Sequence, residues 1–115
     1  MAHDIRAQLR FLSISAQKVR LVVDLVRGKD AVKALEILRF TPQAAAQPVS
    51  KLVASAVANA EENFGVSRDD LFVAKIFADE APTRKWRRFG ARGRFKPIMR
   101  RTSHVTVILR EHEAA

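Results

Sequence analysis

The chain has 115 residues, of which 48% are hydrophobic, a size and composition that fit one globular domain with a modest core. It has no cysteine, which excludes disulfides and thiolate metal sites, and no apolar run long enough for a membrane span. Its 21 Lys and Arg exceed its 12 Asp and Glu, giving a net charge of +9. The expected partner is therefore a polyanion, either nucleic acid or an anionic membrane surface.

A strand and a helix are predicted before residue 30. Residues 3–11 alternate apolar and polar types, which predicts a strand with one buried face. The residues expected on that face are Ile5, Ala7, Leu9 and Phe11. Ser15 is placed to cap a helix over residues 16–27, and Gly28 is placed to end it in the left-handed conformation.

Two further helices are predicted between residues 30 and 62. Asp30 can cap a short helix over residues 31–39. Thr41 and Pro42 form the next start signal, a capping hydroxyl followed by proline, and Pro48 predicts a kink or a restart. Beyond Pro48, apolar residues recur at intervals of three and four, as in an amphipathic helix. They are Val49, Leu52, Val53, Ala56, Val57 and Ala60.

Residues 84–101 are the most strongly charged stretch of the chain. They contain no acid and nine cations, which are Arg84, Lys85, Arg87, Arg88, Arg92, Arg94, Lys96, Arg100 and Arg101. Subtracting these nine from the 21 Lys and Arg leaves twelve, which equals the number of acids, so the rest of the chain is neutral.

The segments around the charged stretch predict a hairpin. Residues 71–79 and 102–109 are rich in Val, Ile, Phe and Thr, as strands are. Gly90 and Gly93 lie where a chain reversal that needs positive φ would fall. We therefore expect an α+β fold in a single domain, residues 1–115. Three helices pack on a small antiparallel sheet, and a long basic β-hairpin over residues 80–104 protrudes from it.

The composition of the hairpin favours nucleic acid as its partner. Trp86, Phe89 and Phe95 are interleaved with the cations, as suits base stacking and cation–π contacts. Both faces of each arm carry charge, so neither face can be buried in the protein's own core. Structured RNA would surround the arm with negative charge and neutralise both faces. A merely solvated basic loop is the alternative.

A second basic cluster, Arg10, Lys18 and Arg20, lies near the start of the first predicted helix. Lys18 and Arg20 gain nothing from the helix dipole at its positive end, so an external anion explains them better. Arg27 and Lys29, near the helix end, are explained by the dipole alone. Whether the first helix binds an anion stays open at this point.

Catalytic chemistry finds little support in the sequence. None of the three histidines has zinc-ligand spacing to another candidate ligand, so no metal site is expected. Ser103 and His104 are neighbours within a strand pattern and point to opposite faces, which makes them a poor nucleophile and base. No glycine loop for a phosphate cofactor is present. We expect neither an enzyme nor a cofactor.

Four motifs resemble the bacterial large-subunit ribosomal protein twenty-two family. They are SAQKVRLVVDLVRG at residues 15–28, SAVANAE at 55–61, ARGR at 91–94 and RTSHVTV at 101–107. The resemblance runs from the first strand to about Leu109. The sequence departs from the family pattern at Ala16-Gln17 and at Phe89-Gly90, where Pro-Arg is common.

The resemblance implies a structural protein of the large ribosomal subunit, in the cytoplasm, with a domain on the outer surface near the tunnel exit. It implies a hairpin that passes through ribosomal RNA, supports assembly and lines the nascent-peptide tunnel with its tip. The implied partners are large-subunit RNA, neighbouring ribosomal proteins and the nascent peptide. The tip also influences macrolide sensitivity and some stalling peptides in this family. The corresponding tip residues are Gly90, Ala91, Arg92 and Gly93.

Residues and resemblance together predict a set of RNA contacts. It comprises Arg10, Lys18, Arg20, Arg84, Lys85, Trp86, Arg87, Arg88, Arg92, Arg94, Lys96, Arg100 and Arg101. No membrane contact and no homo-oligomer are expected. Two other classes remain as alternatives: a free-standing basic nucleic-acid chaperone or DNA-compacting protein, and a membrane-active polypeptide.

Overall fold

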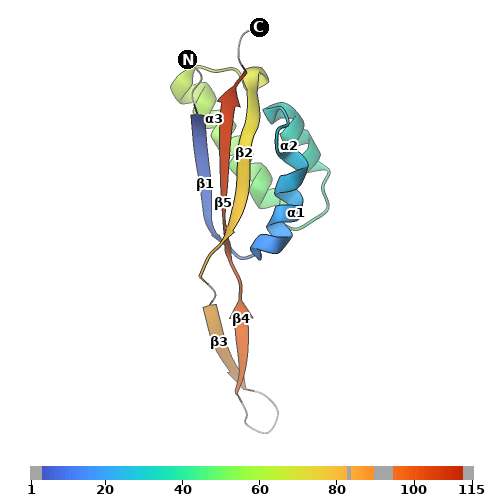
Figure 1. The fold of residues 1–115 in the computed structure, drawn as a ribbon, viewed down its shortest axis with the longest axis vertical. Coiled ribbons are helices and arrows are strands. Elements are labelled where there is room, and N and C mark those ends of the chain that lie inside the picture. The colour runs from blue at the N-terminus through green and yellow to red at the C-terminus, as the bar shows by residue number, and fades with distance from the viewer. Residues whose placement is uncertain (1–3, 83, 90–94, 113–115) are drawn as a thin grey trace.

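The structure, a computed structural model, describes residues 4–82, 84–89 and 95–112, and gives only the backbone for residues 84–89 and 95–100. The elements in chain order are β1 Asp4–Leu12, α1 Ala16–Val26, α2 Ala31–Arg39, α3 Ala46–Phe64, the 3-10 turn η1 Arg68–Asp70, β2 Leu71–Glu80, β3 Arg84–Phe89, β4 Phe95–Arg100 and β5 Ser103–Glu111. The predicted α+β class is confirmed, with three helices packed on an antiparallel sheet (Figure 1).

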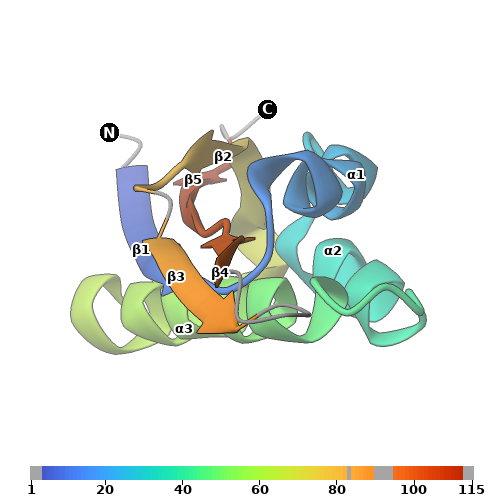
Figure 2. The same cartoon turned by 90° about the horizontal axis from the view of Figure 1, so that it is seen from below.

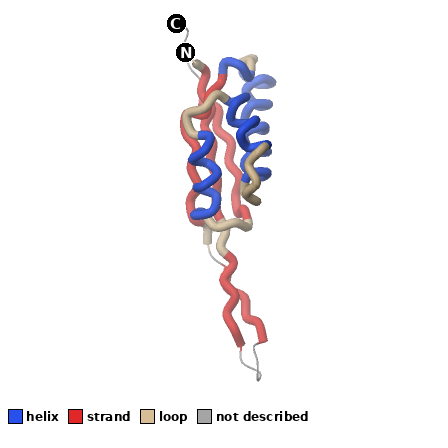
Figure 3. Tube along the Cα trace, turned by 90° about the vertical axis from the view of Figure 1, so that its right-hand side faces the viewer, coloured by secondary structure: helices blue, strands red, loops and turns tan. Residues whose placement is uncertain are grey.

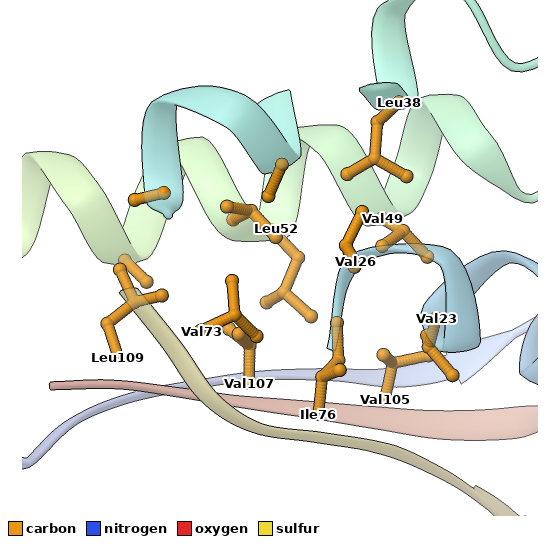
Figure 4. Close-up of a cluster of buried hydrophobic side chains, with 14 of the residues drawn as sticks. Val23, Val26, Leu38, Val49, Leu52, Val73, Ile76, Val105, Val107 and Leu109 are labelled. Atoms are coloured by element: carbon orange, nitrogen blue, oxygen red, sulfur yellow. The ribbon is translucent and has the colours of Figure 1, made fainter. Parts of the chain in front are cut away.

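The main sheet has three antiparallel strands in the order β1-β5-β2. All three helices lie on one face of it and leave the other face open (Figure 2). The central strand β5 supplies the middle of the core, because its inward residues Val105, Val107 and Leu109 are fully buried. They pack with valines and leucines of the helices, as the close-up in Figure 4 shows.

The first two helices begin and end close to the predicted residues. Ser15 and Asp30 occupy the N-cap positions of α1 and α2, but neither side chain makes a capping hydrogen bond. Gly28 follows α1 with a φ of 78°, in the predicted left-handed conformation. Its amide N–H donates to the carbonyl oxygen of Val73 at 3.0 Å, so the end of α1 is joined to β2.

The third helix begins later than predicted. It begins at Ala46 rather than Pro42, and the hydroxyl of Thr41 donates to the carbonyl oxygen of Ile37 at 2.7 Å. Thr41 therefore satisfies a carbonyl at the end of α2 instead of capping α3. Pro48 lies in the first turn of α3, where its missing N–H breaks no helical hydrogen bond, so the predicted interruption is absent.

Strand β1 departs from strict alternation at Phe11. Leu9 pairs with Val105 but Leu12 pairs with Ser103, so β1 has one extra residue in a bulge. Ile5 is buried, and Ala7 and Leu9 are partly buried, as expected. Phe11 is 54% exposed with a φ of 56°, so the prediction that it belongs to the buried face is wrong. The bulge turns its side chain out of the core.

The charged stretch contributes a second, two-stranded sheet. Strands β3 and β4 pair antiparallel, from Arg84 opposite Arg100 to Phe89 opposite Phe95. This ribbon extends beyond the helices and the main sheet (Figures 1 and 3), and the molecule measures 69 × 25 × 19 Å along its principal axes. The predicted tip, residues 90–93, lies outside the described residues.

Candidate RNA-binding surface

The register of the ribbon brings like charges together. Arg84 pairs with Arg100 and Arg88 pairs with Lys96, so two of the six cross-strand pairs join cations. Directly opposed like charges destabilise a strand pair, and a lone two-stranded ribbon is marginally stable in water. The ribbon therefore gains stability from any partner that supplies negative charge. The side chains of residues 84–89 and 95–100, and all of Arg92 and Arg94, lie outside the described residues.

The root of the ribbon is anchored to the domain by hydrogen bonds. The amide of Ala81 donates to the carbonyl oxygen of Thr102 at 3.0 Å. The hydroxyl of Thr102 donates to the carbonyl oxygen of Pro82 at 3.3 Å. The hydroxyl of Ser103, which is fully buried, donates to the carbonyl oxygen of Ile14 at 2.9 Å. Ser103 is thus a structural anchor.

A small cavity lies at this root. It has a volume of about 220 Å³ and is lined by Ser15, Ala16, Gln17, Glu80, Ala81, Arg101 and Thr102. It therefore brings the amino-terminal end of α1 next to Arg101, which is exposed. The first turn of α1 contains no acid, so the positive end of its dipole is not offset by a side chain there.

The basic cluster of α1 is exposed, and its members differ in their contacts. Arg20 donates through Nε to the carbonyl oxygen of Ala78 at 3.1 Å, and Arg10 donates to Gln8 Oε1 at 3.4 Å. Lys18 has no partner among the described residues. The expectation of an external anion therefore fits Lys18 best, because Arg20 also ties α1 to β2.

Arg27 has a structural role that the helix dipole did not suggest. Its Nη2 donates to the carbonyl oxygen of Ile76 at 2.9 Å, and its Nη1 pairs with Asp24 at 2.6 Å. Arg20 and Arg27 thus both donate to carbonyl groups on the outer edge of β2. Such contacts protect an edge strand from pairing with another chain.

The end of the domain opposite the ribbon is acidic. We call it the acidic end and define it as Asp4, Asp30, Glu61, Glu62, Asp69, Asp70 and Glu111. Three backbone contacts gather these segments at the start of β2. Leu71 pairs with Glu111, the amide of His112 donates to the carbonyl oxygen of Asp70, and Asp30 forms a bridge with Phe72. In Figure 1 this is the end that carries both termini.

Two arginines form ion pairs with carboxylates of the acidic end. Arg110 contacts Asp4 at 2.8 Å and Arg68 contacts Glu61 at 2.8 Å. The hydrogen bond to Arg110 lowers the pKa of the Asp4 carboxyl below its ordinary value. The molecule is therefore polar along its length, with the carboxylates of the acidic end at one end and the cation-rich ribbon at the other. The sequence did not show this polarity, because segments distant in the chain combine to form the acidic end.

The described part of the chain contains no group of three or more His, Cys, Asp or Glu placed to hold a metal ion. Among the same residues, no helix has the length and apolar character needed to cross a membrane.

Comparisons with known proteins agree on one family. The sequence model of the family described as ribosomal protein L22p/L17e matches residues 7–110. The large ribosomal subunit protein uL22 of Pediococcus pentosaceus is 48% identical over 108 residues, which cover 94% of this chain and 92% of that protein. The proteins of the same name from Thermoanaerobacter sp. and Thermoanaerobacter pseudethanolicus are each 51% identical over 108 residues, covering 94% of this chain and 97% of theirs.

Proposed function

The chain belongs to the ribosomal protein L22p/L17e family and is a structural constituent of the large ribosomal subunit, and we propose that its ribbon and the start of α1 hold it to ribosomal RNA. Its place is on the ribosome, in the cytoplasm, with large-subunit RNA and neighbouring ribosomal proteins as partners. A structural rather than catalytic role agrees with this family.

The observation that supports the RNA-binding surface is the charge polarity of the molecule. Nine cations lie between residues 84 and 101, and the acidic end lies at the other end of the domain. RNA repels the acidic end and attracts the ribbon, so the protein enters RNA ribbon first. The proposed contacts are Arg10, Lys18, Arg20, Arg84, Lys85, Trp86, Arg87, Arg88, Arg92, Arg94, Lys96, Arg100 and Arg101.

We propose that residues 1–115 act as one RNA-binding domain that includes the hairpin over residues 80–104. Strand β2 ends four residues before β3 begins, and β4 ends three residues before β5 begins. The two connections are therefore too short to make the ribbon a separately folded unit. We also propose that the protein binds as a single copy, since two ribbons with nine cations each would repel one another at one RNA site.

Salt dependence of RNA binding tests the proposed contacts. If about six of the nine cations meet phosphate, log affinity falls against log salt with a slope of about −4 to −5. The triple substitution Arg84→Ala, Arg88→Ala and Arg100→Ala should flatten that slope by about two units. The measurement is a filter-binding or anisotropy titration with large-subunit RNA at several salt concentrations.

A matched control removes the same charge elsewhere. Lys29, Lys33 and Lys51 are exposed cations outside the ribbon and the start of α1. Replacing all three by Ala lowers the net charge equally but should leave the slope almost unchanged. Equal flattening by both triple variants, or by neither, would show that the ribbon is not the RNA contact.

A separate role is proposed for the tip of the hairpin, and the resemblance to the family supports it. Extended residues advance about 3.3 Å each, so a fully extended arm of about eight residues would span roughly 25 Å. We propose that Gly90, Ala91, Arg92 and Gly93 border the nascent-peptide tunnel and meet few phosphates. Deleting these four residues should leave subunit assembly nearly intact and change macrolide response or peptide-dependent stalling.

A second variant tests whether the arms of the hairpin, rather than its tip, are needed for assembly. Subunit profiles and drug sensitivity are measured in one strain for the tip deletion and for a variant with Arg87, Arg88, Arg100 and Arg101 replaced by Ala. The charge variant should be incorporated poorly into large subunits. Blocked assembly in the tip deletion, with normal incorporation of the charge variant, would contradict this division of roles.

The comparisons give no support to a free-standing nucleic-acid chaperone, a DNA-compacting protein or a membrane-active polypeptide.

A further inference from the structure

Phe11 has an unusual backbone conformation. It is the one non-glycine residue in the described part of the chain with a positive φ, at 56°. Bulky residues rarely adopt this region because Cβ crowds the following carbonyl oxygen. A strained residue persists only where the surrounding structure enforces it, and such residues gather at functional sites. The strain at Phe11 therefore calls for an explanation.

Packing does not supply that explanation. The Phe11 side chain is 54% exposed and is absent from the core cluster. Its ring meets the ring of His104 edge to face, with centroids 4.6 Å apart and an interplanar angle of 87°. Its amide N–H donates to His104 Nδ1 at 3.0 Å. The backbone and ring of Phe11 are thus both held by His104, which fixes an exposed aromatic side chain in one position.

Phe11 and His104 lie on the open face of the sheet, close to the root of the ribbon. Register places His104 opposite Asp79 on the open face of the sheet, two residues from Thr102 at the root of the ribbon. Further along the same face, Phe77 is opposite Thr106 and is 38% exposed. Arg10 precedes Phe11 and is exposed. The open face therefore presents aromatic rings with Arg10 beside them, next to the proposed RNA-binding ribbon.

We propose that Phe11, oriented by His104, is a stacking site for an unpaired RNA base at the root of the ribbon. Proteins read single-stranded RNA by stacking bases on exposed aromatic rings, often on an open sheet, while nearby cations hold the phosphates. Phe11 supplies the ring, Arg10 the adjacent cation, and the bulge the fixed orientation. The adjoining segment, residues 84–101, carries nine cations and no acid, so an anionic partner with flat apolar faces fits better than a peptide.

The inference rests on the proposed function, because it assumes that RNA surrounds the ribbon. The decisive variant is Phe11→Gly, since glycine adopts a φ of 56° without strain and the fold keeps its bulge. Its affinity for large-subunit RNA should fall about tenfold, the effect expected for loss of one base–aromatic stack. The salt slope should stay the same because no charge is lost. Thermal unfolding should show that the variant is fully folded at the temperature of the binding measurement.

Two companion variants separate stacking from other contacts. Phe11→Tyr keeps the ring and should bind nearly as tightly as the wild type. Phe11→Leu keeps apolar surface without an aromatic ring and should bind as weakly as Phe11→Gly. The matched control is Phe40→Ala, because Phe40 is 76% exposed and lies 5.8 Å from the guanidinium of Arg39, yet it is at the end of α2. Its RNA affinity should not change.

Each contrary result has a distinct meaning. Wild-type affinity in Phe11→Gly, with loss in the Arg84, Arg88 and Arg100 variant, overturns the stacking site and leaves the proposed function standing. Wild-type affinity in both overturns the proposed function. Normal affinity of Phe11→Gly for isolated RNA combined with poor incorporation into subunits overturns the stacking site and assigns Phe11 to a protein neighbour. Wild-type affinity in Phe11→Leu would show that any apolar side chain suffices at this position, and it would also overturn the stacking site.

Discussion

Single side chains along the edge of β2 do more than their charge suggests. Arg20 and Arg27 are two turns apart on α1, and both donate to carbonyl oxygens of β2. A guanidinium has five donors, so Arg20 retains others for an external phosphate. Lys18 has no such internal role. Replacing Arg20 therefore changes the fold and the RNA contact together, whereas replacing Lys18 changes the RNA contact alone.

The core residues give the clearest stability prediction. Leu109 is fully buried on the central strand, so Leu109→Ala removes apolar contacts and leaves a cavity. It should lower the free energy of unfolding by about 2–5 kcal/mol. Leu21→Ala is the matched control, because Leu21 is 62% exposed, and it should cost less than about 0.5 kcal/mol. Urea unfolding followed by circular dichroism measures both, and equal losses would contradict the assignment of the core.

The ion pair between Asp4 and Arg110 predicts a pH dependence. Its hydrogen bond lowers the folded-state pKa of Asp4 below the ordinary value of 3.8, so the pair stabilises the fold above that value. The contribution is lost as pH falls through the lowered pKa, where the carboxyl is protonated in both states. Asp4→Asn should therefore unfold at a slightly lower temperature than the wild type at pH 7.

The same comparison at low pH completes this test. As pH falls through the lowered pKa of Asp4, the melting temperatures of the wild type and Asp4→Asn should converge, because the Asp4 carboxyl loses its charge. High salt at pH 7 should narrow the difference as well, since both partners are exposed. A difference in melting temperature that stays constant across the acid range would show that Asp4 stabilises the fold by some means other than its charge.

Elements with strong local signals were predicted closely. The end of α1 at Gly28 and the buried stripe of α3 follow from backbone freedom and helical spacing, which are local properties. The start of α3 was misplaced because Thr41 has two possible partners, and the carbonyl of Ile37 at the end of α2 takes its hydroxyl. The bulge at Phe11 depends on contacts with His104, 93 residues away, and alternation along β1 carries no sign of it.

The ribbon is predicted to be less stable than the domain. Its cross-strand pairs include Arg84 with Arg100, and the charges repel when no RNA is bound. Amide hydrogens of residues 84–89 and 95–100 should therefore exchange much faster in the free protein than those of residues 49–60. Hydrogen exchange followed by mass spectrometry measures both segments, and binding of RNA should slow exchange in the ribbon. Similar protection of the two segments in the free protein would contradict this view.

At the scale of the whole molecule, charge and shape follow the same axis. The ribbon lies at one end of a molecule 69 Å long, and the acidic end, with its arginines in ion pairs, lies at the other. The sequence predicted the positive segment, because its nine cations fall within one stretch, residues 84–101. It did not predict the acidic end, which the pairing of β1, β2 and β5 assembles.

Competition for incorporation into subunits tests most directly whether the ribbon holds the protein in the ribosome. Tagged wild type, the variant Arg84→Ala, Arg88→Ala and Arg100→Ala, and the control Lys29→Ala, Lys33→Ala and Lys51→Ala are each expressed beside the untagged protein. The tagged share of the large-subunit peak is measured after a high-salt sucrose gradient. The ribbon variant should be strongly depleted from that peak, and the control should match the wild type. Equal incorporation of the two variants would contradict the account.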